Sequence, residues 1–289
     1  MVAPSARTGW KLLAFAFMLL LFVVSILAGA IGAVVGLGGG VIIIPVLTLL
    51  MGVDIHFAIG ASIVSVIATS SGAAATYVKD KITNLRVGMF LELATTTGAI
   101  CGAAVAAYMN STILEAVFGV VLLVSLAPLL KKIGEDLPPP VELRGLAKRL
   151  GLRGSYVERD GRQVDYNTTN VKRGLVGMYV AGLISGLLGI GSGTFKVISM
   201  DLAMKLPMKV STTTSNFMIG VTAAASAGIY FARGDVNPFI AAPVALGILV
   251  GASIGSRLLV RSRNSTVRKV FAVVLGLSAI EMILRAAGL

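Results

Sequence analysis

The sequence predicts an all-α polytopic membrane protein that contains two inverted repeats of about five membrane segments each. Three observations lead to this fold class. First, the chain of 289 residues is 56% hydrophobic and only 13% charged, whereas average soluble proteins carry about 25% charged residues. Second, apolar runs of membrane-spanning length recur along the chain. Third, the second half of the chain repeats the first at a fixed spacing.

Eight apolar runs mark the expected membrane segments. A bilayer core of about 30 Å requires about 20 residues of helix, and the runs cover residues 12–35, 55–78, 87–108, 113–130, 175–190, 210–231, 239–260 and 267–284. Two shorter apolar pieces, 41–51 and 194–204, each follow a glycine cluster. We therefore expect a multi-pass protein of the cell membrane, surrounded by the lipid bilayer.

One charged segment, residues 131–173, separates the two repeats, which occupy residues 1–130 and 174–289. It holds ten Lys or Arg and six Asp or Glu residues. Because cytoplasmic loops of membrane proteins are rich in Lys and Arg, we expect a solvated cytoplasmic linker. Residues 141–150 predict a short amphipathic helix, and residues 156–166 predict a hairpin that turns at Asp160 and Gly161.

The composition excludes several classes of function. The net charge is +12, but the cations are not interleaved with aromatic residues as in a nucleic-acid groove, so no nucleic-acid partner is expected. The single cysteine, Cys101, and the single histidine, His56, exclude an intramolecular disulfide and the usual Cys and His metal sites. The sequence offers no set of residues suited to nucleophilic catalysis. We therefore expect no enzyme, no cofactor and no metal.

A spacing of 153 residues aligns the two halves without a gap. It pairs Gly29 with Gly182, Gly38 with Gly191, Gly40 with Gly193, Ser62 with Ser215, Thr69 with Thr222 and Gly98 with Gly251. Such a register across many positions indicates an internal repeat.

Charge indicates how the two repeats are oriented. The uncharged turn at Asn110 and Ser111 lies one crossing before the cytoplasmic linker, so we expect it outside the cell. Its counterpart is the basic loop 257–269, which belongs inside by the positive-inside rule. Equivalent turns on opposite sides require inverted repeats. Parallel repeats are the alternative, and they would leave this basic loop outside.

The short apolar pieces decide how each repeat is completed. A helix over residues 41–51 would measure about 16 Å and cannot cross the membrane alone. Extending the glycines just before it brings the length to about 26 Å. The piece therefore either completes a crossing as a broken helix or returns as a re-entrant hairpin.

The two glycine clusters predict helix breaks. Each glycine in a helix interior costs about 1 kcal/mol relative to alanine. A new helix after the break would direct free N–H groups and a positive dipole end toward an anion. The alternative is that the glycines only let helices pack closely. We assign to substrate binding the residues Gly36, Gly38, Gly39 and Gly40 of the first cluster and Gly189, Gly191, Ser192 and Gly193 of the second.

Polar side chains near the breaks extend this predicted site. Lys196 replaces Ile43 of the first half, and a charge inside the membrane normally marks a pathway or a counter-ion. A lysine that snorkels or pairs with Asp201 is the alternative. Glu92 is a candidate proton-coupling carboxylate, with an interfacial position near Arg86 as the alternative. Four further side chains could donate hydrogen bonds to the anion: Ser62, Thr69, Ser215 and Asn216. The alternative is that they bond to backbone carbonyls of their own helices.

At these residues the sequence resembles the TauE/SafE family of membrane anion transporters. The resemblance rests on Gly36-Leu37-Gly38-Gly39-Gly40 followed by Pro45, on residues 189–196 (Gly-Ile-Gly-Ser-Gly-Thr-Phe-Lys) and on residues 214–220 (Thr-Ser-Asn-Phe-Met-Ile-Gly). It implies movement of small sulfur-containing anions such as sulfite, thiosulfate or sulfoacetate. Ser192 and Ile198 depart from the first copy, which has Gly39 and Pro45 at the matching positions.

We therefore expect a secondary transporter that carries a small sulfur-containing anion across the cytoplasmic membrane through a midplane site. The sequence has no P-loop motif, so an ion or substrate gradient would drive transport. A passive anion channel that uses the same site is the first alternative. A non-transporting membrane scaffold or receptor, in which the linker is the active part, is the second.

Overall fold

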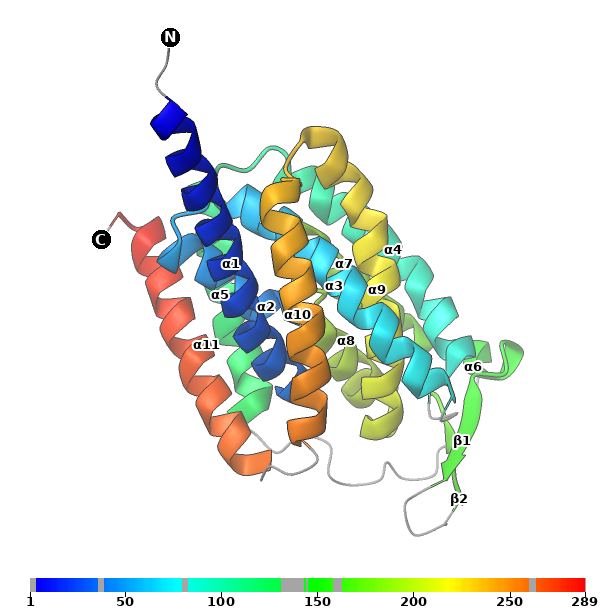
Figure 1. Cartoon of the computed structure of the whole chain (residues 1–289). Helices are drawn as coiled ribbons and strands as arrows, with labels where there is room; N and C mark the ends of the chain where they lie inside the picture. Colours follow the sequence, from blue (N-terminus) through cyan, green and yellow to red (C-terminus); the bar gives the residue numbers. More distant parts are fainter. Residues whose placement is uncertain are drawn as a thin grey trace.

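The computed structural model describes residues 4–35, 39–79, 83–130, 143, 145–157, 163–259 and 264–288. It is a helical bundle with a small β-hairpin at one end (Figure 1). The first half contains α1 (Pro4–Val35), α2 (Gly40–Pro45), the π-helix η1 (Val46–Leu50), α3 (Ile55–Lys79), α4 (Leu85–Ala106) and α5 (Ser111–Leu130). The linker contains α6 (Gly145–Arg149), β1 (Arg153–Val157) and β2 (Gln163–Asn167). The second half contains α7 (Val171–Leu188), α8 (Gly193–Ile198), the π-helix η2 (Ser199–Ala203), α9 (Met208–Arg233), α10 (Pro238–Leu259) and α11 (Asn264–Ala286).

Each predicted apolar run lies largely within a helix. Among the described residues, four helices are long and apolar enough to cross a membrane: Ala14–Ile31 within α1, Leu85–Ala106, Val171–Leu188 and Met208–Arg233. Shorter apolar stretches occur at Gly40–Leu50, Ile55–Ser70, Ser111–Leu126 and Pro238–Ile254. The helical, multi-pass membrane class predicted from the sequence agrees with this architecture.

A short helix follows each glycine cluster, as the sequence predicts. α2 begins at Gly40 and α8 begins at Gly193, and each continues directly into a π-helix of five residues. The π-helical turns are not predicted by the sequence. Such wider turns are rare and often occur near functional sites.

The second half follows the order of the first half at the predicted spacing. α2 and α8, α3 and α9, α4 and α10, and α5 and α11 each begin 153 residues apart. Equivalent helices make equivalent contacts, because α1 packs on α10 while α7 packs on α4, and α3 packs on α10 while α9 packs on α4. In Figure 1, α4 leads away from the hairpin end of the molecule, whereas its counterpart α10 leads toward that end.

Glycines let the α4–α7 and α1–α10 pairs approach closely. A β-carbon at Gly182 would overlap the carbonyl oxygen of Thr95, and one at Gly186 would overlap that of Ala99. Gly251 of α10 is equally close to the backbone of α1. Small-residue contacts of this kind are common between membrane helices. The glycines of the two clusters are closely packed as well, since a β-carbon at Gly39, Gly40, Gly189, Gly191 or Gly193 would overlap a neighbouring atom.

The linker contains the predicted hairpin and a short helix. β1 and β2 pair antiparallel, with Tyr156 opposite Val164. The predicted turn at Asp160 and Gly161 lies outside the described residues. The short helix is α6, which covers residues 145–149 of the predicted stretch 141–150.

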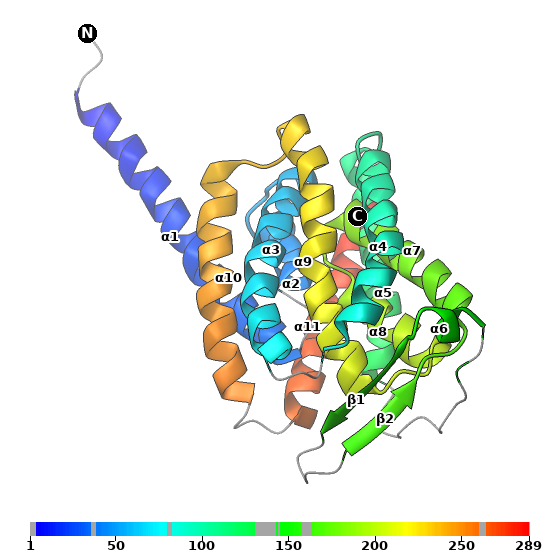
Figure 2. The ribbon, with the colours of Figure 1, turned by 90° about the vertical axis from the view of Figure 1, so that its right-hand side faces the viewer.

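The hairpin packs on the bundle through one face, while Arg153, Ser155, Gln163 and Asp165 on its other face are exposed. Tyr156 and Tyr166 are buried in a cluster with side chains of α4, α7, η2 and α9. In Figure 2, the strands β1 and β2 lie at the lower end of the bundle. The Asn84 side chain donates to Tyr166 Oη (2.9 Å) and to the carbonyl oxygen of Arg153 (3.3 Å). The Asn84 backbone N–H donates to Thr214 Oγ1 (3.1 Å). The linker therefore contacts both halves at one end of the bundle.

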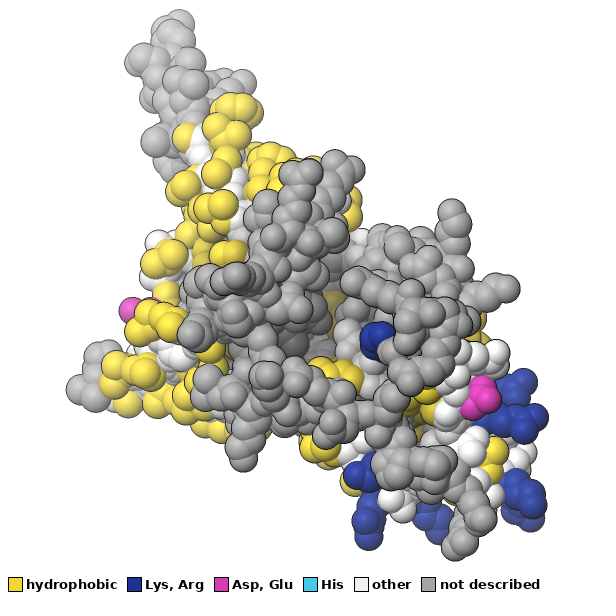
Figure 3. All heavy atoms as spheres, turned by 90° about the horizontal axis from the view of Figure 1, so that it is seen from below, with side chains coloured by type: hydrophobic (Ala, Val, Ile, Leu, Met, Phe, Trp, Pro, Cys, Tyr) yellow, Lys and Arg dark blue, Asp and Glu magenta, His cyan; other side chains and the backbone are white. Residues whose placement is uncertain are grey.

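Cations gather at the hairpin end of the molecule. Figure 3 looks onto this end and shows Lys and Arg side chains around the linker, whereas hydrophobic side chains cover other parts of this view. This is the distribution that a cytoplasmic linker would have.

Candidate functional site

The second glycine cluster breaks the chain between α7 and α8. Gly189 and Gly191 have φ angles of 65° and 71°, and Ser192 has a φ of 41°. This left-handed region favours glycine because a β-carbon is strained there. Ser192 is held in place by a short hydrogen bond from its hydroxyl to the carbonyl oxygen of Ala181. The cluster therefore forms a tight, buried turn, as the sequence predicts for a helix break.

The first glycine cluster is described in part, since Gly36 and Gly38 lie outside the described residues. Gly39 packs against the Ile248 side chain of α10, and Gly40 lies against the Ser62 hydroxyl of α3. A β-carbon at Gly40 would also lie 3.3 Å from the carbonyl oxygen of Gly189. The start of α2 and the break after α7 are thus neighbours, although they belong to different halves.

Two predicted serines bond to these glycine-rich segments. Ser62 Oγ donates to the carbonyl oxygen of Gly189 (2.8 Å), and Ser215 Oγ donates to that of Gly193 (3.2 Å). A serine hydroxyl has a single proton, so both protons are used by backbone carbonyls. The structure brings these four residues together, and in this state the serines offer an anion no hydroxyl donor.

The other two predicted polar side chains are not part of this contact. Thr69 Oγ1 bonds within α3, to the carbonyl oxygens of Ser65 (3.0 Å) and Val66 (3.2 Å). This is the backbone bonding that threonine often makes inside a helix. Asn216 is half-buried on α9, and within the described part of the chain its side chain makes no hydrogen bond.

Lys196 is fully buried on α8. Its Nζ donates a hydrogen bond of 2.6 Å to Thr222 Oγ1 on α9, so the ammonium group points into the protein and does not snorkel. Among the described residues, the Lys196 ammonium group is hydrogen-bonded to Thr222 and is not paired with Asp201. Thr222 lies two helical turns beyond Ser215, or about 10 Å along α9. α8 therefore runs along one face of α9, from the glycine break to the lysine.

Glu92 of α4 completes a chain of polar side chains. Its Oε1 lies 2.6 Å from Thr222 Oγ1 and 3.2 Å from Thr96 Oγ1. The residue is 8% exposed, and its second oxygen, Oε2, is buried without a hydrogen-bond partner among the described residues. The Glu92 side chain therefore faces α9 inside the protein.

The Thr222 hydroxyl serves both charged groups. Its oxygen accepts from the Lys196 ammonium, and its proton is available to Glu92 Oε1 or to the carbonyl oxygen of Met218 at 2.8 Å. A buried charge is costly unless it is paired and hydrogen-bonded, and here a cation and a carboxylate are joined through one hydroxyl. We call Lys196, Thr222 and Glu92 the buried polar triad.

The sequence marks Thr222 only as one of several hydroxyl side chains on its helix that could line an anion, and it does not predict Thr96 for the site. The repeat aligns Thr222 with Thr69, but no sequence signal indicates that Thr222 reaches Lys196. Thr96 is recognisable only because it follows Glu92 by one helical turn. The positions 153 residues away from the triad hold Ile43, Thr69 and Ala245. The charged arrangement therefore has no charged counterpart at the repeat-related positions.

Comparisons with known proteins give a consistent result. Residues 21–282 match the family described as "Sulfite exporter TauE/SafE". The chain is 28% identical over 273 residues to "Probable membrane transporter protein YunE" of Bacillus subtilis (strain 168), which covers 91% of this chain and 96% of that protein. It is 24% identical over 241 residues to "Probable membrane transporter protein YdhB" of the same strain, covering 83% of this chain and 89% of that protein. It is also 24% identical over 291 residues to "Probable membrane transporter protein MJ0441" of Methanocaldococcus jannaschii, covering 94% and 98%. No solved structure matches the chain.

Proposed function

Because this chain belongs to the sulfite exporter TauE/SafE family of membrane transporters, we propose that it is a secondary transporter for a small sulfur-containing anion. The candidate substrates are sulfite, thiosulfate and sulfoacetate-like anions, carried across the cytoplasmic membrane. The family description is the reason for choosing sulfur chemistry, since the named relatives are called membrane transporters without a substrate.

The fully buried ammonium group of Lys196 is the main reason for proposing an anionic substrate. A charge inside a membrane protein is expensive and normally functional. Among the described residues, its hydrogen bond goes to a neutral hydroxyl, which leaves further N–H donors of the ammonium for a ligand. The oxygens of a sulfur oxyanion would accept from these donors, and charge-assisted hydrogen bonds are the strong ones.

We propose that Glu92 is the residue that couples transport to the movement of protons. In the empty site an ionised Glu92 balances Lys196 through Thr222. When an anion binds beside Lys196, two negative groups share one cation, and a nearby like charge favours protonation of the carboxylate. Glu92 Oε2, which is buried and unpartnered among the described residues, is the atom that would take this proton. A monovalent anion such as hydrogen sulfite would then travel with one proton, and the net charge of the site would stay constant.

We further propose that two inverted repeats provide alternating access. Support comes from the matched order of the elements 153 residues apart and from the opposite directions of α4 and α10 in Figure 1. Transporters of this kind bind substrate near the midplane at broken helices and rock one repeat against the other. In this chain the glycine-rich breaks before α2 and α8 would form the backbone walls of that site.

Transport by the purified protein in proteoliposomes tests the proposal. Uptake of labelled sulfite and sulfoacetate is measured over a concentration series, with and without a pH gradient. We expect saturable uptake that responds to the gradient. Lys196→Met should slow uptake by about tenfold or more, because it removes a charged hydrogen-bond donor. Lys205→Met, which changes an exposed lysine of the same half, is the matched control and should leave uptake unchanged.

Three other outcomes would each change the conclusion. Flux that does not saturate at high concentration would indicate a passive anion channel. A folded protein that gives no flux above empty liposomes for any of these anions would be a different transporter or a membrane scaffold. Unchanged flux in Lys196→Met would remove the lysine from the substrate site.

A further inference from the structure

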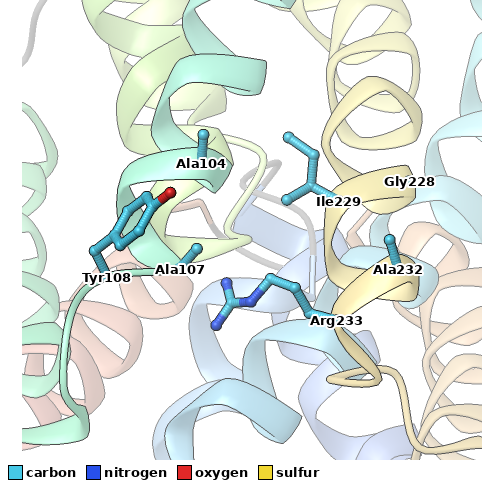
Figure 4. Close-up of a pocket in the computed structure, with 7 residues that line it drawn as sticks. All are labelled: Ala104, Ala107, Tyr108, Gly228, Ile229, Ala232 and Arg233. Carbon is cyan, nitrogen blue, oxygen red and sulfur yellow. The ribbon is translucent and has the colours of Figure 1, made fainter.

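A pocket of about 440 Å³ opens between the ends of α4 and α9, at the end of the bundle opposite the linker hairpin. The pocket walls come mainly from Ala104, Ala107 and Tyr108 on one side and from Gly228, Ile229 and Arg233 on the other (Figure 4). Most of these side chains are small or apolar. Arg233 is the charged residue of this lining.

Arg233 is held firmly but keeps an unused donor. Its Nη2 lies 3.1 Å from Asp235 Oδ2, and its guanidinium carbon lies 5.6 Å from the centre of the Tyr230 ring. Its other terminal nitrogen, Nη1, is buried and has no hydrogen-bond partner among the described residues. In Figure 4 the guanidinium extends across the pocket toward Ala107 and Tyr108. A fixed guanidinium with a free N–H is suited to an oxyanion.

The pocket lies where two membrane helices end. α4 and α9 are both long and apolar enough to cross a membrane. Arg233 is the last residue of α9, and Tyr108 follows the end of α4 and is 91% exposed. Tyrosines gather at the headgroup level of membranes, so this rim lies at that level. Ala104 and Ile229 lie one helical turn deeper, by about 6 Å, at the level of the acyl chains.

We infer that this pocket binds a membrane phospholipid. The lipid phosphate accepts from the guanidinium group of Arg233, and part of one acyl chain lies between Ala104 and Ile229. The groove is open at Gly228, where an added β-carbon would meet nothing within 4 Å. Because Asp235 already balances the charge of Arg233, the phosphate is recognised rather than the net charge of the headgroup. The site therefore takes anionic and zwitterionic phospholipids alike, and it does not depend on the proposed transport function.

Native mass spectrometry of the detergent-solubilised full chain tests this inference. The probes are phosphatidylglycerol, phosphatidylethanolamine, diacylglycerol, which lacks the phosphate, and glycerol 3-phosphate, which lacks the acyl chains. We expect either phospholipid to stay bound while the other two probes do not. Arg233→Gln should weaken the retention of both phospholipids about tenfold, because it removes a charge-assisted hydrogen bond. Gly228→Leu should do the same by filling the groove.

Two control variants make the result specific. Arg173→Gln removes an exposed arginine at the hairpin end, and Gly276→Leu adds a side chain at another open helix position, where the nearest atom to a β-carbon is 3.9 Å away. Both should bind lipid like the unchanged protein. If Arg233→Gln does not fold, Gly228→Leu still tests the groove with the ion pair intact.

The inference would be overturned by any of the following results. Equal retention of diacylglycerol would remove the role of the phosphate. Competition by glycerol 3-phosphate would make the pocket a site for a soluble anion. Binding of phosphatidylglycerol alone would show selection by net charge, and unchanged binding in Gly228→Leu would place the lipid elsewhere.

Discussion

Ser62 of α3 donates its hydroxyl proton to the carbonyl oxygen of Gly189, which lies just beyond the end of α7 in the other half of the chain, at 2.8 Å. The last carbonyls of a helix have no partner within that helix. In the membrane interior water cannot satisfy them, so a protein group must do so. Ser62 therefore stabilises the helix break, and through it the contact between the two halves.

Ser62→Ala should lower the free energy of unfolding by about 1–3 kcal/mol, because it leaves a buried carbonyl oxygen without its donor. The measurement is thermal unfolding of the purified protein in detergent. Thr69→Val is the matched control, since the Thr69 hydroxyl bonds only to carbonyls of its own helix in the described structure. An equal loss in both variants would show that the Ser62–Gly189 bond has no special role.

Thr222→Val should reduce anion uptake by about tenfold or more, because Lys196 and Glu92 lose the hydroxyl that joins them. The substitution keeps the shape of the side chain, so the helix packing is preserved. Thr222→Ser keeps the hydroxyl and should restore most of the uptake. A serine variant as slow as the valine variant would mean that the methyl group, and not the hydrogen bond, matters.

Glu92→Gln should remove the response of uptake to a pH gradient. The amide has nearly the shape of the carboxyl group but does not titrate, so it cannot carry a proton with the anion. The measurement compares uptake with and without the gradient in the variant and in the unchanged protein. Glu281→Gln, which alters an exposed glutamate of α11, is the control. A full gradient response in Glu92→Gln would place the coupling at another residue.

Gly186→Ala should destabilise the protein by about 1–3 kcal/mol, because its β-carbon would overlap the carbonyl oxygen of Ala99 and force α7 away from α4. Gly228→Ala places the same methyl group in open space and should stabilise α9 slightly, through the higher helix propensity of alanine. Thermal unfolding of the two variants gives the comparison. Equal stability would show that the α4–α7 contact adapts without cost.

The docked hairpin should weaken at high pH. Burial raises the pKa of Tyr166, the hydrogen bond from Asn84 opposes this rise, and Tyr156 adds to it. Below the ordinary pKa of about 10, both the folded and the unfolded state hold the proton, so the contribution of Tyr166 is complete. As the pH rises above that value, the unfolded state loses its proton first, and stability falls. The measurement is the rate at which a protease cleaves the linker, which should rise between about pH 8 and about pH 11.

Tyr166→Phe provides the control for this pH effect. The variant cannot ionise at this position, so the additional cleavage at high pH should shrink. The same rise in cleavage in both proteins would attribute the effect to other groups.

The helices and their order could be read from the sequence because they depend on local properties. An apolar run of about 20 residues has few options other than a membrane helix. The repeat then fixes where helices begin, as with α3 at Ile55 and α9 at Met208, which are 153 residues apart. The hairpin was also predictable, because Tyr156 and Tyr166 flank a turn in an alternating pattern.

The contacts between helices could not be predicted in the same way. In a soluble protein the apolar stripe of a helix shows which side faces the core. Here the lipid-facing and buried sides are both apolar, as Leu93 (69% exposed) and Leu91 (0% exposed) of α4 illustrate. The sequence therefore gives little information on helix rotation. This is why the meeting of Glu92 with Thr222, and of Ser62 with Gly189, appears only in the structure.

Lys196 and Ile43 occupy equivalent positions, and both side chains are fully buried. Glu92, in contrast, belongs to the first copy, and its counterpart in the second copy is Ala245. The cation and the carboxylate that are joined through Thr222 thus come from different halves of the chain. Two halves that matched at these positions would carry either no charges or two of each. The charged pair therefore makes the two halves non-equivalent, because each half supplies one group that the other lacks.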